Sequence, residues 1–317
     1  MKETISYNIL CATDDNYVPY CGIMLTSLFE NNKELNFCIY ILVEQLSNKS
    51  KNEFATLARI YNQRIEIITV DSDKLKDCPI QSDDYVSIAT YYRLLAPILL
   101  PQNVEKILYL DCDMIVDGNI EDLYNTDIEN VAVATVLDED YLNEAKYKRL
   151  EYLKSTHYFN AGMLLINLSY WRKTDVMQRC LNYIKDKKEI LTFHDQDTLN
   201  YILRDEKKEL HTKYNLQTGL LYKNRKLEQH IIKEIDEAVN SPIIIHYTGL
   251  NKPWINDSNH PYANIFLYYK SISLWNSDEY TIYNRNKINF KEIILNIAYR
   301  LKIKKRYYNF IIEKQHK

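Results

Sequence analysis

The stretch Tyr109-Leu110-Asp111-Cys112-Asp113 closes an apolar run that begins at Lys106 and ends in two aspartates. The run predicts a β-strand over Lys106–Asp111, and the alternation of side chains along a strand points Asp111 and Asp113 to one side, with Cys112 facing away. Two carboxylates held this close repel each other unless they are protonated or share a cation. At the carboxyl edge of a parallel sheet, a shared divalent metal would resolve that repulsion. The alternative is that two solvent-facing aspartates end a strand and have no further role.

Around this stretch, short β-branched runs alternate with segments of helical periodicity, which predicts an α/β protein with a mostly parallel sheet covered on both faces. A helix is expected over residues 19–30, and Ser50 with Glu53 predicts a capping box that opens a second helix through Tyr61. No internal repeat or flexible linker precedes residue 256. The expected strands are Tyr7–Thr13, Phe37–Val43, Ile65–Val70, Lys106–Asp111, Val131–Leu137, Met163–Leu168 and Ile243–Tyr247.

Composition excludes several functional classes. The chain has 317 residues, 46% of them hydrophobic, and a net charge of −3, so no overall basic field favours nucleic acid. Its five glycines are too far apart for a G-x-G-x-x-G or a P-loop phosphate cradle, so a nucleotide would be held by other means. The six cysteines form no C-x-x-C pair, which predicts free thiols in a reducing compartment. With no signal peptide or apolar run of membrane-spanning length, we expect a cytoplasmic protein.

The C-terminal part differs in charge from the rest. We expect one domain over residues 1–256 and a helical extension over 257–317. Residues 288–317 carry eight Lys or Arg and two Glu, with apolar residues at helical spacing. Such a basic amphipathic segment either docks its apolar face on the domain or binds an anionic membrane surface.

A polar cluster, Ala12-Thr13-Asp14-Asp15-Asn16-Tyr17, directly follows the first expected strand. Asp14 or Asn16 could cap the next helix, which is the structural interpretation. Capping needs one such residue, however, and the surplus suits a nucleoside. A carboxylate could bind ribose hydroxyls, an amide could bind the base edge, and the Tyr17 ring could stack on it.

Three later motifs carry further polar groups. In Phe159-Asn160-Ala161-Gly162, the glycine permits a close backbone approach, although a turn would explain it equally well. In His194-Asp195-Gln196-Asp197, acids at a helix start are favourable without any function. His246-Tyr247-Thr248-Gly249, followed by Lys252, suits metal and phosphate binding, or else holds a core histidine bonded to backbone.

These motifs, in this order and spacing and with Tyr91-Tyr92-Arg93-Leu94 before the Asp-x-Asp strand, resemble family 8 glycosyltransferases over residues 6–256. That family includes bacterial lipooligosaccharide galactosyltransferases, general-stress-type glycosyltransferases and glycogenin. The resemblance implies the GT-A nucleotide-sugar fold, Mn²⁺ (or Mg²⁺) as cofactor, and retaining transfer of galactose or glucose from a UDP-hexose.

The resemblance also implies site roles, position by position. Asp195 and Gln196 would be catalytic. The metal ligands would be Asp111, Asp113 and His246. Uridine would be held by Ala12, Asp14, Asn16 and Tyr17, and the diphosphate by Gly249 and Lys252. The donor site would be completed by Arg93, Cys112, Asn160, Ala161, Gly162, Asp195 and Gln196.

The expected acceptor is a cell-surface glycan such as lipopolysaccharide, reached at the inner face of the plasma membrane through residues 288–317. Three alternatives stay open at this stage: a non-catalytic UDP-sugar-binding scaffold, transfer to a protein acceptor, and a metal-dependent nucleotidyltransferase or phosphatase. Because an amide such as that of Gln196 is a poor nucleophile, we expect the acceptor hydroxyl to attack on the face that the phosphate leaves, without a covalent enzyme intermediate.

Overall fold

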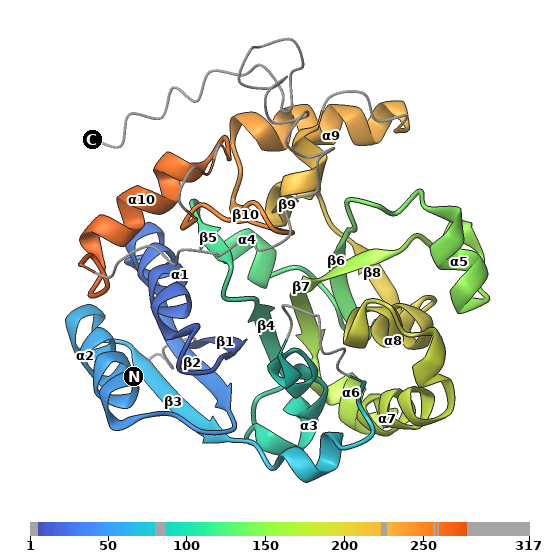
Figure 1. The fold of residues 1–317 in the computed structure, drawn as a ribbon, viewed down its shortest axis with the longest axis horizontal. Helices are drawn as coiled ribbons and strands as arrows, with labels where there is room; N and C mark the ends of the chain where they lie inside the picture. Colours follow the sequence, from blue (N-terminus) through green and yellow to red (C-terminus); the bar gives the residue numbers. More distant parts are fainter. Residues whose placement is uncertain (1–5, 80–86, 223–226, 256–257, 259, 278–317) are drawn as a thin grey trace, which may run out of the picture.

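Two β-sheets organise the part of the chain that the computed structural model describes, which is residues 6–79, 87–222, 227–255, 258 and 260–277. Figure 1 shows the larger sheet through the middle of the molecule. Its strand order is β3 (Arg64–Thr69), β2 (Asn36–Val43), β1 (Ser6–Ala12), β4 (Lys106–Leu110), β7 (Phe159–Asn167), β6 (Val133–Leu137) and β8 (Lys207–Glu209). The second sheet has the order β5 (Met114–Val116), β10 (Ile244–His246) and β9 (Leu216–Gln217).

The α/β fold class with a mostly parallel sheet is confirmed. Strands β3, β2, β1 and β4 are parallel, as are β6 and β8, while β7 runs antiparallel to both β4 and β6. All seven expected strands are present. The one predicted over Met163–Leu168 begins four residues earlier, at Phe159, so Asn160 and Gly162 lie inside β7 and not in a turn before it.

Both faces of the large sheet are buried, as expected for parallel strands that read as continuous apolar runs. Along β1, Ile9 and Cys11 join one hydrophobic core and Leu10 joins the other. The first core is covered by α1 (Val18–Asn31), α2 (Asn48–Tyr61) and α10 (Ala263–Ile272). The second is covered by the 3₁₀ segment η2 (Ile88–Leu95), α3 (Ala96–Leu99), α6 (Leu168–Lys173), α7 (Val176–Lys187) and α8 (His194–Leu203). The other described helices are α4 (Glu121–Tyr124), α5 (Glu144–Leu150) and α9 (Gln229–Asn240), with 3₁₀ segments at 72–75, 154–156, 188–190, 212–214 and 218–221.

The predicted capping box at Ser50 and Glu53 is wrong, because α2 begins one turn earlier. Ser47 is the N-cap, and its side-chain oxygen accepts from the backbone N–H of Ser50. Asp15 fixes this start from outside the helix, since its carboxylate accepts from the Ser47 N–H and, at 2.5 Å, from the Ser50 hydroxyl. Both serines thus contact Asp15, and Ser47 is the one whose side chain caps the helix.

Helix α10 and the residues after it pack on α1. Trp275, only 2% exposed, lies against Gly22 so closely that a Cβ at Gly22 would fall 1.9 Å from the indole ring. The predicted basic segment, residues 288–317, lies outside the described residues. Among the described residues, no helix combines the length and apolarity that crossing a bilayer requires. The six cysteines are free, and all but Cys78 are buried.

The small sheet brings a late segment of the chain to the end of β4. Strand β10 pairs antiparallel with β5, with His246 opposite Met114. The Tyr247 N–H then donates to the Asp113 carbonyl at 3.0 Å, which extends this pairing by one step. The segment that carries His246 is thus fastened beside the turn that carries the two aspartates.

Candidate active site

An open pocket of about 600 Å³ gathers most of the residues that the sequence singled out. It lies at the carboxyl ends of β1 and β4, the edge at which α/β sheets bind ligands. The predicted residues that line it are Ala12, Asp14, Asn16, Tyr17, Arg93, Asp111, Cys112, Asp113, Asn160, His246, Gly249 and Lys252. The other four predicted residues do not line the pocket but contact residues that do, and they are Ala161, Gly162, Asp195 and Gln196.

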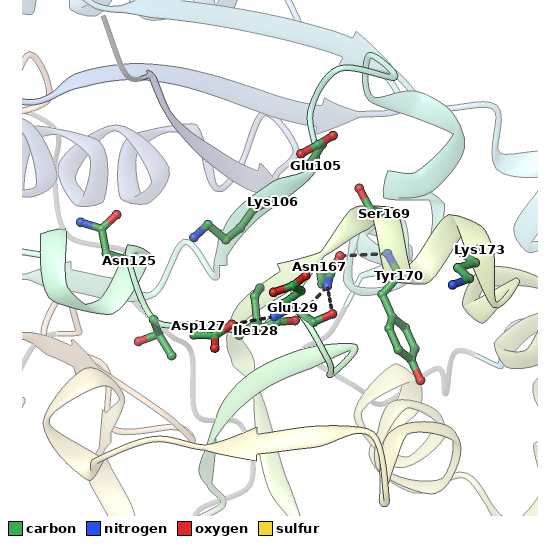
Figure 2. A pocket seen from close by; sticks show the side chains of 11 residues that line it. Glu105, Lys106, Asn125, Asp127, Ile128, Glu129, Asn167, Ser169, Tyr170 and Lys173 are labelled. Carbon is green, nitrogen blue, oxygen red and sulfur yellow. Dashed lines mark hydrogen bonds between the residues drawn. The ribbon is translucent and has the colours of Figure 1, made fainter.

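A second cavity, of about 440 Å³, opens near the start of β4 and contains none of the predicted residues (Figure 2). Its side chains already serve the fold. Asn167 donates to the Ile128 carbonyl at 2.8 Å and accepts from the Tyr170 N–H at the same distance. Among the described residues, the one cluster that could hold a metal lies in the first pocket, so we place the candidate site there.

The segment after β1 combines a structural and an exposed part. Asp14 accepts from the N–H groups of Asn16 at 2.9 Å and Tyr17 at 3.1 Å, which forms a turn into α1. The prediction that Asp14 or Asn16 caps this helix is wrong, because the N-cap of α1 is Tyr17 and it has no side-chain capping bond. Asn16 is exposed and Tyr17 half-buried, and both face the pocket, so the polar surplus that the sequence indicated is present.

Asp111 and Asp113 come together on the turn after β4, and each has its own cationic partner. Asp111 accepts from the Tyr109 hydroxyl at 2.7 Å and from Arg93 Nη2 at 3.1 Å. Asp113 lies 2.5 Å from Lys252 Nζ and 3.2 Å from His246 Nε2. Burial alone would raise the pKa of Asp113, but the charges of Lys252 and His246 outweigh it and hold that pKa well below its ordinary value.

Asp111, Asp113 and His246 each offer one ligand atom, and these atoms lie within 4.8 Å of one another. His246 is buried, and its Nδ1 is 3.0 Å from Asn215 Oδ1. Asn215 in turn donates from Nδ2 to Asn160 Oδ1 at 2.9 Å, so its oxygen must face the imidazole. Nδ1 therefore donates to Asn215, which directs Nε2 at the two aspartates, the arrangement found in metal-binding histidines.

Gly162 explains how β7 approaches this group so closely. A Cβ at Gly162 would lie 2.4 Å from His246 Cε1, 2.8 Å from Asp111 Oδ2 and 3.0 Å from Asn160 Oδ1. Since real Cβ contacts below 3.0 Å essentially never occur, only glycine fits at this position. The expectation of close backbone approach is confirmed.

Arg93, from η2, links the aspartate pair to the acid of α8. Its side chain is 4% exposed, and its Nε lies 3.0 Å from Asp195 Oδ2. Although burial alone would lower the Arg93 pKa, Asp111 and Asp195 raise it, so the guanidinium stays charged. It also donates to the Ala161 carbonyl and lies 4.1 Å above the Tyr109 ring.

Asp195 is buried beside the pocket with one oxygen that lacks an aligned hydrogen bond. Its Oδ1 accepts from the Thr90 hydroxyl at 2.6 Å. Its Oδ2 has no hydrogen-bond partner, because the Arg93 Nε–H points instead to the Thr90 carbonyl at 2.9 Å. Burial raises the pKa of Asp195, against the opposing effects of Arg93 and Thr90. An unsatisfied buried carboxylate oxygen is a costly feature that a bound hydroxyl would relieve.

Asp197, two residues later, has a structural role. It is fully buried, forms a two-pronged ion pair with Arg149 at 2.7 and 3.0 Å, and accepts from the N–H groups of Thr192 and Phe193. These bonds fix the loop that enters α8, where His194 takes the left-handed backbone conformation at φ 50°.

Sequence reasoning missed the residues that position the site from elsewhere in the chain. Asn215 joins His246 to Asn160, and Thr90 holds Asp195. Tyr109 was quoted as part of a strand, but its hydroxyl orients Asp111. Asn215 and Thr90 lie outside every motif quoted from the sequence. Of these two residues, Thr90 directly precedes a quoted motif, Tyr91-Tyr92-Arg93-Leu94.

Comparison with known sequences identifies relatives over most of the chain. The profile of glycosyl transferase family 8 matches residues 8–258. General stress protein A of Bacillus subtilis is 30% identical over 282 residues, which cover 87% of this chain and 96% of that protein. The lipopolysaccharide glucosyltransferase WaaO of Escherichia coli is 31% identical over 281 residues, with 86% and 80% covered.

Among solved structures, the fold matches that of the galactosyltransferase LgtC, whose structure was determined in complex with donor and acceptor sugar analogs. The TM-score is 0.76 at 24% identity, over 84% of this chain and 96% of that one. At this identity the likeness concerns the fold alone, and it agrees with the GT-A architecture expected from the sequence.

Proposed function

The chain belongs to glycosyl transferase family 8 and is a hexosyltransferase, and we propose that it transfers galactose or glucose from a UDP-sugar to a cell-surface glycan, with Mn²⁺ and with retention of configuration. One observation carries this proposal. Asp111, Asp113 and His246 present ligand atoms within 4.8 Å of one another, beside Lys252 and in one pocket with Asn16 and Tyr17. That is an arrangement suited to a nucleoside diphosphate with a divalent cation.

The donor atoms at this position fit a hard divalent metal. Two carboxylates and one imidazole suit Mn²⁺, with Mg²⁺ as the alternative, and the Asn215 bond presents the lone pair of His246 Nε2. When bound there, the ion would neutralise the charge that develops on the departing diphosphate. One pair of unit charges at 4 Å attracts with about 4 kcal/mol at an effective dielectric constant of about 20, and a divalent ion would attract about twice as strongly as a lysine does.

Residues on both sides of this position suit the rest of UDP. We assign uridine to Ala12, Asp14, Asn16 and Tyr17, with the half-buried Tyr17 ring as the stacking surface. Lys252 and Gly249 are assigned to the diphosphate. Gly249 has φ 72°, and a Cβ there would meet no heavy atom within 4 Å, so backbone conformation and not space favours glycine.

The donor sugar would lie against Arg93, Asn160, Ala161 and Asp195. Asp195 supplies the one buried carboxylate oxygen next to the pocket that lacks a hydrogen bond among the described residues. A sugar hydroxyl that donates to it would satisfy this oxygen. The negative charge would also stabilise positive charge on the anomeric carbon as the bond to phosphate breaks.

The contacts of Gln196 support attack on the same face of the sugar. Its Oε1 accepts from the Ala161 N–H at 2.9 Å and from Asn160 Nδ2 at 3.3 Å, and these two donors further weaken an amide oxygen that is already a poor nucleophile. We therefore assign the attack to the acceptor hydroxyl, with its proton passing to the departing phosphate oxygen. A trapped covalent adduct on Gln196 or Asp195 would overturn this assignment.

For the acceptor, we propose a lipopolysaccharide-type glycan, supported by the name of the relative WaaO. A lipid-linked acceptor lies at a membrane, which suits the surface role that the sequence predicts for residues 288–317. The experiment is a screen of UDP-galactose and UDP-glucose with Mn²⁺, with and without a lipopolysaccharide acceptor. Metal-dependent release of UDP, increased by acceptor, is expected. UDP binding without consumption of either donor would favour a scaffold instead.

A further inference from the structure

A buried ion pair lies directly behind the donor-sugar side of the candidate site, and it has no role in the proposal so far. Asp138 and Lys146 are 4% and 3% exposed, and Lys146 Nζ lies 2.6 Å from Asp138 Oδ1. The ammonium also lies 4.4 Å from the ring centre of Tyr158 and 4.6 Å from that of Phe193. Because desolvation offsets most of the attraction within such a pair, stability alone is a weak reason for its presence.

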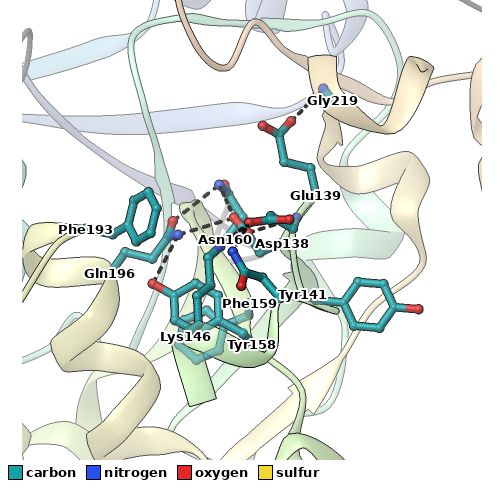
Figure 3. Close-up of polar contacts among 12 residues, drawn as sticks. Asp138, Glu139, Tyr141, Lys146, Tyr158, Phe159, Asn160, Phe193, Gln196 and Gly219 are labelled. Carbon is teal, nitrogen blue, oxygen red and sulfur yellow. Dashed lines mark hydrogen bonds and ion pairs between the residues drawn. The ribbon is translucent and has the colours of Figure 1, made fainter. Parts of the chain in front are cut away.

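The second oxygen of Asp138 contacts the site itself, as Figure 3 shows. Asp138 Oδ2 accepts from Gln196 Nε2 at 3.2 Å and lies 3.5 Å from Asn160 Nδ2. At its other end, Gln196 Oε1 accepts from the Ala161 N–H at 2.9 Å. A carboxylate only accepts and a backbone N–H only donates, so the two ends of the Gln196 amide cannot be exchanged. Asp138 Oδ2 and the Ala161 N–H therefore hold this amide in one orientation from its two ends.

Lys146 supplies the positive charge that compensates the negative charge of the buried Asp138 carboxylate. Without it, Asp138 would be a buried carboxylate with no cationic partner at hydrogen-bond distance, and the carboxylate would move or admit water. Either change alters what faces Gln196 Nε2 and frees the amide to turn. Asn160, which Asp138 and Gln196 both contact, would lose these two contacts of its Nδ2 at the same time.

We propose that Lys146 is a positioning residue for the transfer reaction: through Asp138 it fixes the side-chain amide of Gln196, and with it Asn160, against the donor sugar. This inference rests on the proposed function in so far as it assigns these amides to the donor. Lys146 itself touches no reacting atom. Its contribution is the charge that keeps one hydrogen-bond acceptor in place.

The first test compares Lys146→Met with Lys148→Met, a matched control that removes an exposed lysine from the same helix. A misplacement of about 1 Å at a reacting centre can cost about 100-fold in rate. We expect Lys146→Met to lower kcat by about 10- to 100-fold with the KM for the donor changed by less than about twofold. Lys148→Met should match the wild type. A parallel loss of kcat and donor affinity, or no loss, would overturn the proposal.

The second test needs no catalysis, so it separates failure of this inference from failure of the proposed function. The protein is labelled with ¹⁵N-glutamine, and the side-chain NH₂ signals of Gln196 are assigned by their absence in Gln196→Met. Ligand-free Lys146→Met should shift these signals, and Lys148→Met should not. Unchanged Gln196 signals in folded Lys146→Met would contradict the proposal even if the protein transferred no sugar.

If Lys146→Met alone does not fold, the pair is tested with both charges removed. Asp138→Asn offers one carbonyl oxygen to two donors, Lys146 Nζ and Gln196 Nε2, so in that background the lysine competes with the amide for the oxygen. Removing the lysine as well leaves that oxygen to Gln196 Nε2, so we expect Asp138→Asn/Lys146→Met to have a kcat equal to or above that of Asp138→Asn. A further tenfold loss in the double variant would show that Lys146 acts by another route.

Discussion

Gly162→Ala tests whether the narrow approach of β7 to the proposed metal ligands matters for catalysis. The added methyl group would lie 2.4 Å from His246 Cε1 and 2.8 Å from Asp111 Oδ2. Ordinary van der Waals contact begins near 3.4 Å, so the imidazole must retreat by about 1.0 Å and the carboxylate by about 0.6 Å. Two of the three ligands are therefore displaced by one methyl group.

A displacement of about 1 Å at a reacting centre costs about 100-fold, which corresponds to about 2.7 kcal/mol of transition-state stabilisation. The cost in folding should be about 1–3 kcal/mol, as for other overpacked interiors, so the variant should remain folded. We therefore expect kcat/KM to fall by about 100-fold and Mn²⁺ to bind more weakly, in a protein with a modestly lower Tm.

The assay is the initial rate of UDP release with Mn²⁺, beside calorimetric titration of Mn²⁺ in the presence of UDP. Gly118→Ala is the control, because its added methyl would meet the flexible end of Ile243 at 2.7 Å, away from the pocket. It should keep activity within about twofold. Gly162→Ala with wild-type rate and Mn²⁺ affinity would refute the placement of the metal.

Three further outcomes are expected. Asp113→Asn removes a proposed ligand and should weaken Mn²⁺ binding by at least about 100-fold, because even residues that only hydrogen-bond to a metal ligand typically contribute about 10- to 100-fold to metal affinity. Titration with Mn²⁺ measures this, and unchanged affinity would exclude Asp113 as a ligand. Asp195→Asn should lower kcat far more than it weakens UDP binding, and an equal loss of both would indicate a binding role. Because burial raises the Asp195 pKa and the Thr90 hydrogen bond lowers it, kcat/KM should rise with pH through a value above that of an ordinary aspartate. Thr90→Val should move this acid limb to higher pH, and a shift to lower pH would contradict the assignment of the limb to Asp195.

Local patterns predicted the strands and the polar clusters at their ends, because both are encoded within a few positions, whereas the full set of pocket residues came from the family resemblance. The carboxyl ends of parallel strands converge at one edge, so Asp14 and Asp111 could be placed together from strand ends alone. The local sequence does not indicate whether a strand runs parallel or antiparallel to its neighbours. Only the structure showed that β7 runs antiparallel to β4 and β6. The structure also placed Gly162 inside this strand, where a turn had been one of the expectations.

The residues that orient the site could not be predicted, because their partners are distant in sequence. Asn215 and Thr90 are ordinary polar residues until folding brings them to His246 and Asp195. The start of α2 was misjudged for the same reason. Two serines stood at suitable positions, and Asp15, which accepts from both at the start of the helix, lies 32 residues from Ser47 in the chain.

The most direct measurement of the central claim is anomalous scattering at the manganese edge from crystals soaked with Mn²⁺ and UDP. The account predicts one strong peak within coordinating distance of Asp111, Asp113 and Nε2 of His246, next to the diphosphate. A peak elsewhere, or UDP bound with no manganese at these three side chains, would contradict it.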